Sequence, residues 1–129
     1  MILGIGLDAF APSRLARLLR EDLGAAGEFF LQAEIAGIGT SDADLRRLAT
    51  IFAIKEAAFK ALAPPPSAGA RWREVAVRLD RTVPTIGLTG ALAIAAEGLQ
   101  PLKLHVATAG CGDLVVALAI AETIENSPT

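Results

Sequence analysis

The sequence has few of the residues that form disulfides or metal centres through sulfur and imidazole, with one cysteine and one histidine among 129 residues. The single cysteine, Cys111, forms no internal disulfide. One cysteine with one histidine also does not make a zinc site, because the remaining ligands would all be carboxylates. These scarcities exclude a disulfide-stabilised fold and zinc chemistry from the expected functions.

Long apolar runs and an excess of basic charge are also lacking. No stretch reaches the roughly 18 uninterrupted apolar residues of a membrane-spanning helix, and the N-terminal segment lacks the basic start and cleavage site of a secretory signal. The net charge of -2, a pI near 5.3 and the lack of interleaved aromatic and basic residues give no general attraction to nucleic acid. We therefore expect a cytoplasmic protein with no membrane or nucleic-acid partner.

Apolar side chains are abundant: hydrophobic residues make up 53% of the chain, and the mean hydropathy is +0.49. A chain of this length forms one compact domain, so residues 1–129 are expected to fold as a single unit. So small a domain has a limited interior, and apolar side chains that it cannot bury tend to meet another copy of the chain. We predict a homo-oligomer.

The order of the expected elements predicts an α+β domain. The longest element is a helix that starts at the variant capping box of Ser41 and runs to Leu62, where three prolines soon follow. We expect this central helix to pack on a mixed or antiparallel sheet. The other predicted elements are strands over 2–8, 74–79, 86–88, 102–107 and 114–121, helices over 12–23 and 90–98, a short helical or irregular piece over 28–35 and a loop over 64–71.

Glu56 and Lys60 are the first candidates for chemistry. They lie four residues apart in the predicted helix, on one ridge with Phe52. A surface ion pair is the simpler interpretation of this spacing. However, large apolar side chains at Phe52 and Phe59 bracket the charges, which favours a partly buried carboxylate that needs a strong partner such as a metal ion.

Asp8 closes the first predicted strand and is the second acidic candidate. Alone, such an aspartate is more often a turn residue or a helix cap. Gly4 and Gly6 share its face of the strand, where the lack of side chains lets a helix approach the backbone closely. If the helix that carries Glu56 packs there, the two carboxylates can hold Mg²⁺ while Lys60 neutralises a phosphate.

The segment GIGLD, followed later by FAIKEAAFKAL, resembles the phosphopantetheinyl transferases, and within them the holo-acyl-carrier-protein synthase type. Further motifs match in the same order: Arg14 after the aspartate, Pro84 with Leu88 and Gly90, and His105 followed by Val106. The resemblance thus runs over most of the chain, and the KEAxxK helix is its most specific part.

The resemblance implies transfer of 4'-phosphopantetheine from coenzyme A to a serine of an apo acyl carrier protein. In this reaction Asp8 and Glu56 would hold Mg²⁺, and Lys60 would stabilise or protonate the departing phosphate. The family also suggests a trimer with coenzyme A between neighbouring subunits. The candidate contacts to coenzyme A are Lys55, Lys60, Arg14 and His105.

His105 is also a candidate catalytic residue, although a lone histidine in a strand is more often structural. Arg14, Arg17 and Arg20 recur along the first helix. In the family the corresponding helix docks the acidic carrier protein, so these arginines can steer that partner. A solvated helix face explains the same pattern equally well.

The chain departs from the family pattern at four places that bear on coenzyme A or catalysis. The alternative to an active, divergent transferase is therefore a catalytically inactive relative that serves as a binding or assembly subunit. A plain α+β oligomer without a ligand is a third possibility. Retention of both acids and the lysine favours the enzyme. The four departures are Ile51 for an arginine, Ala63 and three prolines for a glycine-rich turn, Val83 for a lysine, and 107–110 for a hydroxyl-rich strand.

Overall fold

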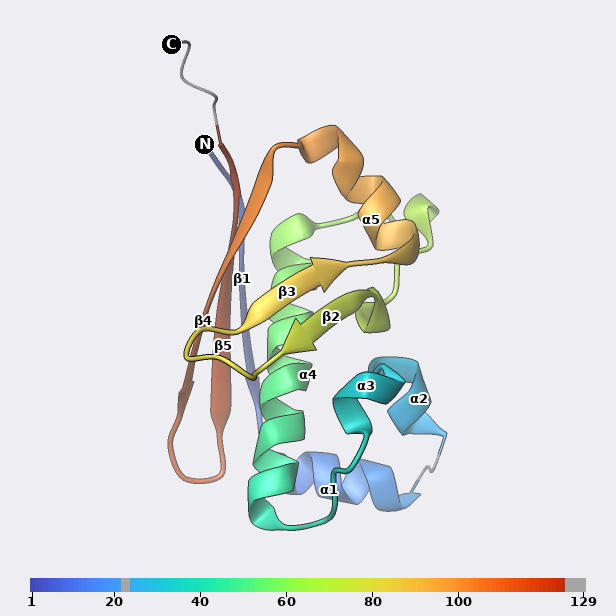
Figure 1. Ribbon diagram of the computed structural model, residues 1–129, viewed down its shortest axis with the longest axis vertical. Coiled ribbons are helices and arrows are strands. Elements are labelled where there is room, and N and C mark those ends of the chain that lie inside the picture. The colour runs from blue at the N-terminus through green and yellow to red at the C-terminus, as the bar shows by residue number, and fades with distance from the viewer. Residues whose placement is uncertain (22–23, 125–129) are drawn as a thin grey trace.

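The computed structural model describes residues 1–21 and 24–124 and places one long helix between two antiparallel sheets (Figure 1). The three-stranded sheet lies on one side of that helix and the two-stranded sheet on another. The elements are β1 (Ile2–Phe10), α1 (Pro12–Glu21), α2 (Ala25–Phe29), α3 (Gln32–Ile35), α4 (Asp42–Leu62), β2 (Val75–Arg78), β3 (Thr85–Leu88), α5 (Gly90–Ala96), β4 (Leu102–Gly110) and β5 (Val115–Thr123), with short 3-10 turns at 66–68, 72–74 and 97–99.

The larger sheet has the strand order β1-β5-β4, and the smaller one pairs β2 with β3. This arrangement confirms the predicted α+β class and the antiparallel alternative, with the strands divided between two sheets. The predicted elements are found close to their expected positions, although β1, β4 and β5 are longer than the patterns indicated, and Asp8 lies within β1 instead of closing it. The predicted end of the first helix at Leu23 lies outside the described residues.

Helix α4 is the centre of the fold and is buried along most of its length. Ser41 caps its N-terminus as predicted, because the Ser41 hydroxyl accepts a hydrogen bond of 3.1 Å from the backbone N–H of Asp44. At its C-terminus, Ala63 adopts a left-handed conformation with φ 44° and ψ 54°. In the described part of the chain, none of the helices combines the length and the apolar character needed to cross a membrane.

Strand β1 lies against α4 almost backbone to backbone. A Cβ atom built on Gly4 would lie 2.1 Å from the carbonyl oxygen of Ala61, and one built on Gly6 would lie 1.8 Å from that of Ala57. No other residue type fits such a contact without moving the helix or the strand. The bare face of β1 is thus the face that the helix covers, as predicted.

The opposite face of β1 carries the apolar side chains of the strand, yet it is open. Ile5 is 61% exposed and Leu7 60% exposed. Among the described residues no helix covers this side of the larger sheet (Figure 1). We call this surface, with Leu3, Ile5 and Leu7 on β1, the outer sheet face. An exposed apolar surface of this kind is typical of a protein interface.

Candidate active site

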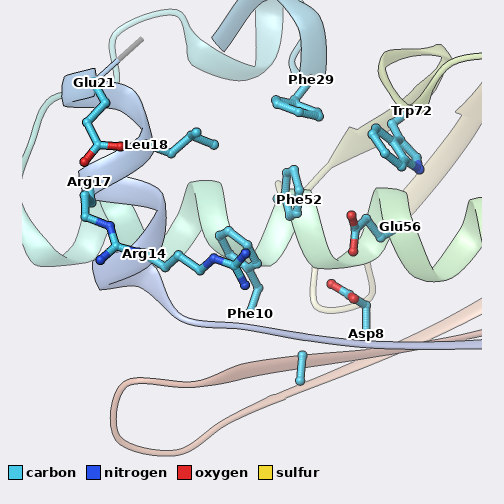
Figure 2. Close-up of a pocket in the computed structure, with 11 residues that line it drawn as sticks. Asp8, Phe10, Arg14, Arg17, Leu18, Glu21, Phe29, Phe52, Glu56 and Trp72 are labelled. Atoms are coloured by element: carbon cyan, nitrogen blue, oxygen red, sulfur yellow. The ribbon is translucent and has the colours of Figure 1, made fainter. Parts of the chain in front are cut away.

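The C-terminal part of β1 and the middle of α4 bring Asp8 and Glu56 to one cavity of about 430 Å³. Figure 2 shows their carboxylates turned toward each other. The close approach of β1 and α4 at Gly6 and Ala57 produces this juxtaposition, because Asp8 and Glu56 are close neighbours of that contact in sequence. The predicted meeting of the two acids on the helix-covered face of the strand is found.

The environment of Glu56 disfavours its charged form. Burial is the larger cause and the neighbouring carboxylate of Asp8 the next, and together they raise the pKa of Glu56 to about 7. Lys60 and Arg14 act in the opposite direction with smaller effect. Near neutral pH the two acids therefore favour a shared proton or a bound cation over two uncompensated negative charges.

The site also has an unsatisfied oxygen. Oδ2 of Asp8 is buried and accepts no hydrogen bond from the described residues, whereas most buried polar atoms in proteins have a partner. No set of three or more histidine, cysteine or acidic ligands occurs in the described chain. Two carboxylates with an unpaired oxygen fit Mg²⁺, which is commonly bound by one or two carboxylates together with water and substrate phosphates.

Lys60 lies at the edge of this acidic pair. Its Nζ atom is 3.4 Å from Oδ1 of Asp8 and donates a hydrogen bond of 3.1 Å to the carbonyl of Leu7. The Lys60 side chain is 55% exposed, so its ammonium group is free to move toward an incoming anion. The structure thus brings together Asp8, Glu56 and Lys60, the three residues that the sequence placed in one reaction.

Helix α1 forms another wall of the cavity with Arg14 and Arg17. The Arg14 guanidinium lies 5.7 Å from the centroid of the Phe10 ring, a distance suited to a cation–π interaction. The Phe10 ring in turn packs against Phe52, with centroids 4.5 Å apart. Arg17 and Glu21 lie together at one end of the cavity and the carboxylates of Asp8 and Glu56 at the other, with the Arg14 side chain extending from the first end toward Phe10 (Figure 2).

Aromatic side chains complete the cavity, and sequence reasoning missed most of them. The centroid of Phe29 lies 5.3 Å from that of Phe52 and 5.7 Å from that of Trp72. Four of the six aromatic residues in the chain line this one cavity. The scarcity of aromatics was visible in the sequence, but their convergence depends on packing between distant segments.

Comparison with known proteins agrees with the fold and the site. Residues 4–119 match the 4'-phosphopantetheinyl transferase superfamily. The chain belongs to this superfamily. The holo-[acyl-carrier-protein] synthase of Anaeromyxobacter dehalogenans is 35% identical over 126 residues, which cover 95% of this chain and 97% of that protein. A second such synthase, from an Arthrobacter species, is 33% identical over 122 residues and covers 95% of this chain and 99% of its own length.

Solved structures of the same group share the fold. The crystal structure of the holo-[acyl-carrier-protein] synthase from Neisseria meningitidis has a TM-score of 0.81 at 26% identity, covering 95% of this chain and 100% of that one. A coenzyme A complex of the Chronobacterium ammoniagenes synthase has a TM-score of 0.79 at 23% identity, covering 95% and 98%. The predicted family and the predicted fold of this phosphopantetheinyl transferase are therefore confirmed.

Two predicted site residues of this transferase lie apart from the cavity. Lys55 is fully buried, and its Nζ atom lies 2.9 Å from Oε1 of Glu34. Its side chain has no exposed atom with which to make the predicted contact to coenzyme A. Consecutive residues of an α-helix point in different directions, so Lys55 points into the core although the adjacent Glu56 faces the cavity.

His105 lies on the outer sheet face. In the register of the larger sheet, His105 stands opposite Ile120, which pairs with Ile5, whereas Asp8 stands opposite Ala117. Successive positions along a strand face opposite sides, so one chain does not bring His105 to the carboxylates. Its Nε2 atom lies 2.7 Å from Oε2 of Glu122, and the His105 side chain is 41% exposed.

The departures from the family pattern also have definite positions. Ile51 is 1% exposed and belongs to the core of the transferase, so its side chain does not reach a phosphate. Ala63 occupies the left-handed turn where the family usually has glycine. Val83 is 62% exposed, and 107–110 form the exposed end of β4. None of the four lines the cavity that contains Asp8 and Glu56.

Proposed function

We propose that this chain transfers 4'-phosphopantetheine from coenzyme A to a serine hydroxyl of an apo acyl carrier protein, with Mg²⁺ held by Asp8 and Glu56. The observation that carries the proposal is the buried, unpartnered Oδ2 of Asp8 beside Glu56, whose pKa is raised to about 7. An arrangement of this kind is costly unless a cation or a proton joins the two acids.

The side chains have distinct roles in this proposal. Mg²⁺ supplies charge neutralisation for the pyrophosphate of coenzyme A. The serine hydroxyl gives up its proton to solvent, its oxygen bonds to the phosphorus that carries pantetheine, and the bond to the leaving adenosine 3',5'-bisphosphate breaks. Lys60, with its half-exposed ammonium group beside Asp8, stabilises or protonates the departing phosphate.

Helix α1 serves the carrier protein in this proposal. Arg14 and Arg17 place positive charge on the cavity wall, and opposite charge on an acidic carrier would increase the rate of association and orient the encounter. Arg14 also remains a candidate contact to coenzyme A. Glu21 on the same wall offsets part of this charge, and the two arginines keep the wall basic in a chain whose net charge is -2.

The proposal includes a homotrimer that buries the outer sheet face and binds coenzyme A between subunits. The exposure of Ile5 and Leu7 supports association, since such side chains gain about 25 cal/mol per Å² of apolar surface that they bury. His105 shares this face, so a second copy can bring it to the cavity of its neighbour. We expect Leu7→Asp to yield monomers in light scattering, and a trimer that persists in this variant contradicts the assignment.

The decisive experiment for the function is a mass measurement on the carrier. The protein is incubated with coenzyme A, Mg²⁺ and a panel of apo carriers, and each carrier is examined for the added mass of phosphopantetheine on its serine. The fatty-acid and polyketide carriers in the panel identify the pathway. Both substrates are used inside the cell, so the proposed location is the cytoplasm.

The alternative, an inactive relative, has a different outcome in the same experiment. The inactive relative gains support if coenzyme A with Mg²⁺ does not stabilise the fold, because a bound ligand at a hundred times its dissociation constant should add about 2.7 kcal/mol. The buried Ile51 and the left-handed Ala63 are the features that favour this alternative. No stabilisation and no transfer would therefore favour this alternative over the active transferase.

A further inference from the structure

The ion pair of Glu34 and Lys55 is the most deeply buried charge pair among the described residues, with side chains 3% and 0% exposed. Each partner also binds the backbone. Lys55 donates to the carbonyl of Val75, and the two carboxylate oxygens of Glu34 accept from the N–H groups of Leu31 at 2.7 Å and Val77 at 2.9 Å. The pair therefore joins α3, α4 and β2 through directional hydrogen bonds.

These bonds occupy the edge of β2 that β3 does not cover. The carbonyl of Val75 and the N–H of Val77 point to the same side of the strand, where a third strand would otherwise bind them. Glu34 and Lys55 take the place of that strand. Hydrogen bonds to these two side chains, in place of a continuous ladder, thus connect this edge of β2 to α3 and α4.

Stability alone is a weak explanation for such a pair. Two charges lose their hydration on burial, and apolar residues of similar volume are often as stable or more stable in the same place. Consistent with this cost, burial is the largest cause that lowers the pKa of Lys55. Apolar replacements would lose the hydrogen bonds that fix the backbone groups of Leu31, Val75 and Val77.

Those backbone atoms stand next to the aromatic wall of the cavity. Phe29 lies two residues before Leu31, whose N–H binds Glu34, and Trp72 lies three residues before Val75, whose carbonyl binds Lys55. Phe29 and Trp72 contact each other with centroids 5.7 Å apart. Of the cavity residues, only these two lie outside β1, α1 and α4.

We propose that Glu34 and Lys55 are positioning residues: they hold Phe29 and Trp72 at the wall of the cavity that the proposed carrier contacts Arg14 and Arg17 also line, so that the carrier protein can dock there. Neither side chain of the pair touches a substrate. The proposal rests on the proposed transferase function for its kinetic consequence. Its structural consequence, a change at Trp72, is independent of that function.

The test is the double variant Lys55→Met with Glu34→Gln, which removes both charges and retains an amide oxygen that can accept a hydrogen bond. Trp72 is the only tryptophan, so its fluorescence reports the wall directly. We expect acrylamide to quench Trp72 about twice as effectively in the folded variant. The KM for the carrier should rise about tenfold, as for other partners that orient site residues, while kcat changes little because Asp8, Glu56 and Lys60 are intact.

The matched control is the exposed pair on the outer end of β2, Arg78 and Asp80, 3.2 Å apart with side chains 75% and 53% exposed. Arg78→Met with Asp80→Asn should leave quenching and kinetics unchanged, because exposed pairs contribute little. A folded Lys55→Met, Glu34→Gln variant with native quenching, or with altered quenching but a native KM, overturns the positioning role.

A second variant tests the proposal if the double variant does not fold. Glu34→Gln alone keeps Lys55 and an acceptor oxygen, and it should shift quenching and KM in the same direction by a smaller factor. Native values for this variant overturn the proposal. If the wild-type protein transfers nothing, the proposed function fails, and the quenching of Trp72 still decides whether the pair holds the wall.

Discussion

Replacing Glu56 by glutamine should have opposite effects on transfer and on stability. The variant loses a proposed metal ligand, so we expect transfer to fall by about a hundredfold or more, as when a preorganised electrostatic group is removed from an active site. The same change removes a carboxylate whose pKa is raised from 4.5 to about 7 by burial and by Asp8. The metal-free protein should therefore become more stable.

The size and the pH dependence of this gain follow from the raised pKa. A raised pKa in the folded state means a contribution to stability that is complete below about pH 4.5 and is lost as the pH rises through about 7. One pKa unit corresponds to about 1.4 kcal/mol, so the rise from 4.5 to about 7 corresponds to about 3.5 kcal/mol at high pH, which solvent screening of this partly exposed carboxylate reduces to about 2 to 3 kcal/mol. Glutamine has no such loss, and its advantage should be about 2 to 3 kcal/mol near pH 8 and below about 1 kcal/mol near pH 5.

The assay is urea unfolding at several pH values in the presence of a chelator, at constant protein concentration, followed by the same series with Mg²⁺. Mg²⁺ should stabilise the wild-type protein and not the variant. Glu97→Gln, at an exposed position far from the cavity, is the matched control. Full transfer activity in Glu56→Gln, or a stability difference that does not vary with pH, would refute the reasoning.

Three further changes test other parts of the structure. Gly6→Ala should destabilise the fold by about 3 kcal/mol or more in urea unfolding, because its Cβ would lie 1.8 Å from the carbonyl oxygen of Ala57; a native unfolding curve contradicts the close packing. Ala63→Gly should stabilise it by about 1 kcal/mol and raise the Tm by about 4 °C, since glycine tolerates φ 44°; an unchanged or lower Tm argues against the left-handed turn. Lys60→Ala should reduce transfer about a hundredfold with less than about 1 kcal/mol of lost stability, because the Lys60 side chain in its ion pair with Asp8 is 55% exposed; wild-type kcat in this variant excludes a role at the phosphate.

The elements that the sequence predicted best are those with local signals. Helix α4 begins at a capping serine and ends near a proline run, and both signals act within a few residues. The signal for the bare face of β1 was equally local, since Gly4 and Gly6 alternate with the apolar residues of the strand. From these two elements the meeting of Asp8 and Glu56 followed.

What the sequence did not reveal depends on contacts between distant segments. The alternation in β1 predicted that α4 packs on the glycine face, but the exposure of Ile5 on the opposite face depends on whether another element covers that side of the sheet. Lys55 was expected near coenzyme A, and only the tertiary structure shows its partner Glu34. The side of the sheet on which His105 lies depends on the register of β4 and β5.

The contact between β1 and α4 leaves no side chain between the two backbones that support the acids. Evolution and protein engineering therefore have no local means of adjusting this part of the molecule gradually, because the smallest possible substitution at Gly4 or Gly6 already displaces main chain. In a library of random variants we expect tolerance to be asymmetric along this strand, with free exchange on the outward side and strict retention on the inward side. Substitutions intended to stabilise the fold and substitutions intended to change the reaction would both be limited by these same two positions.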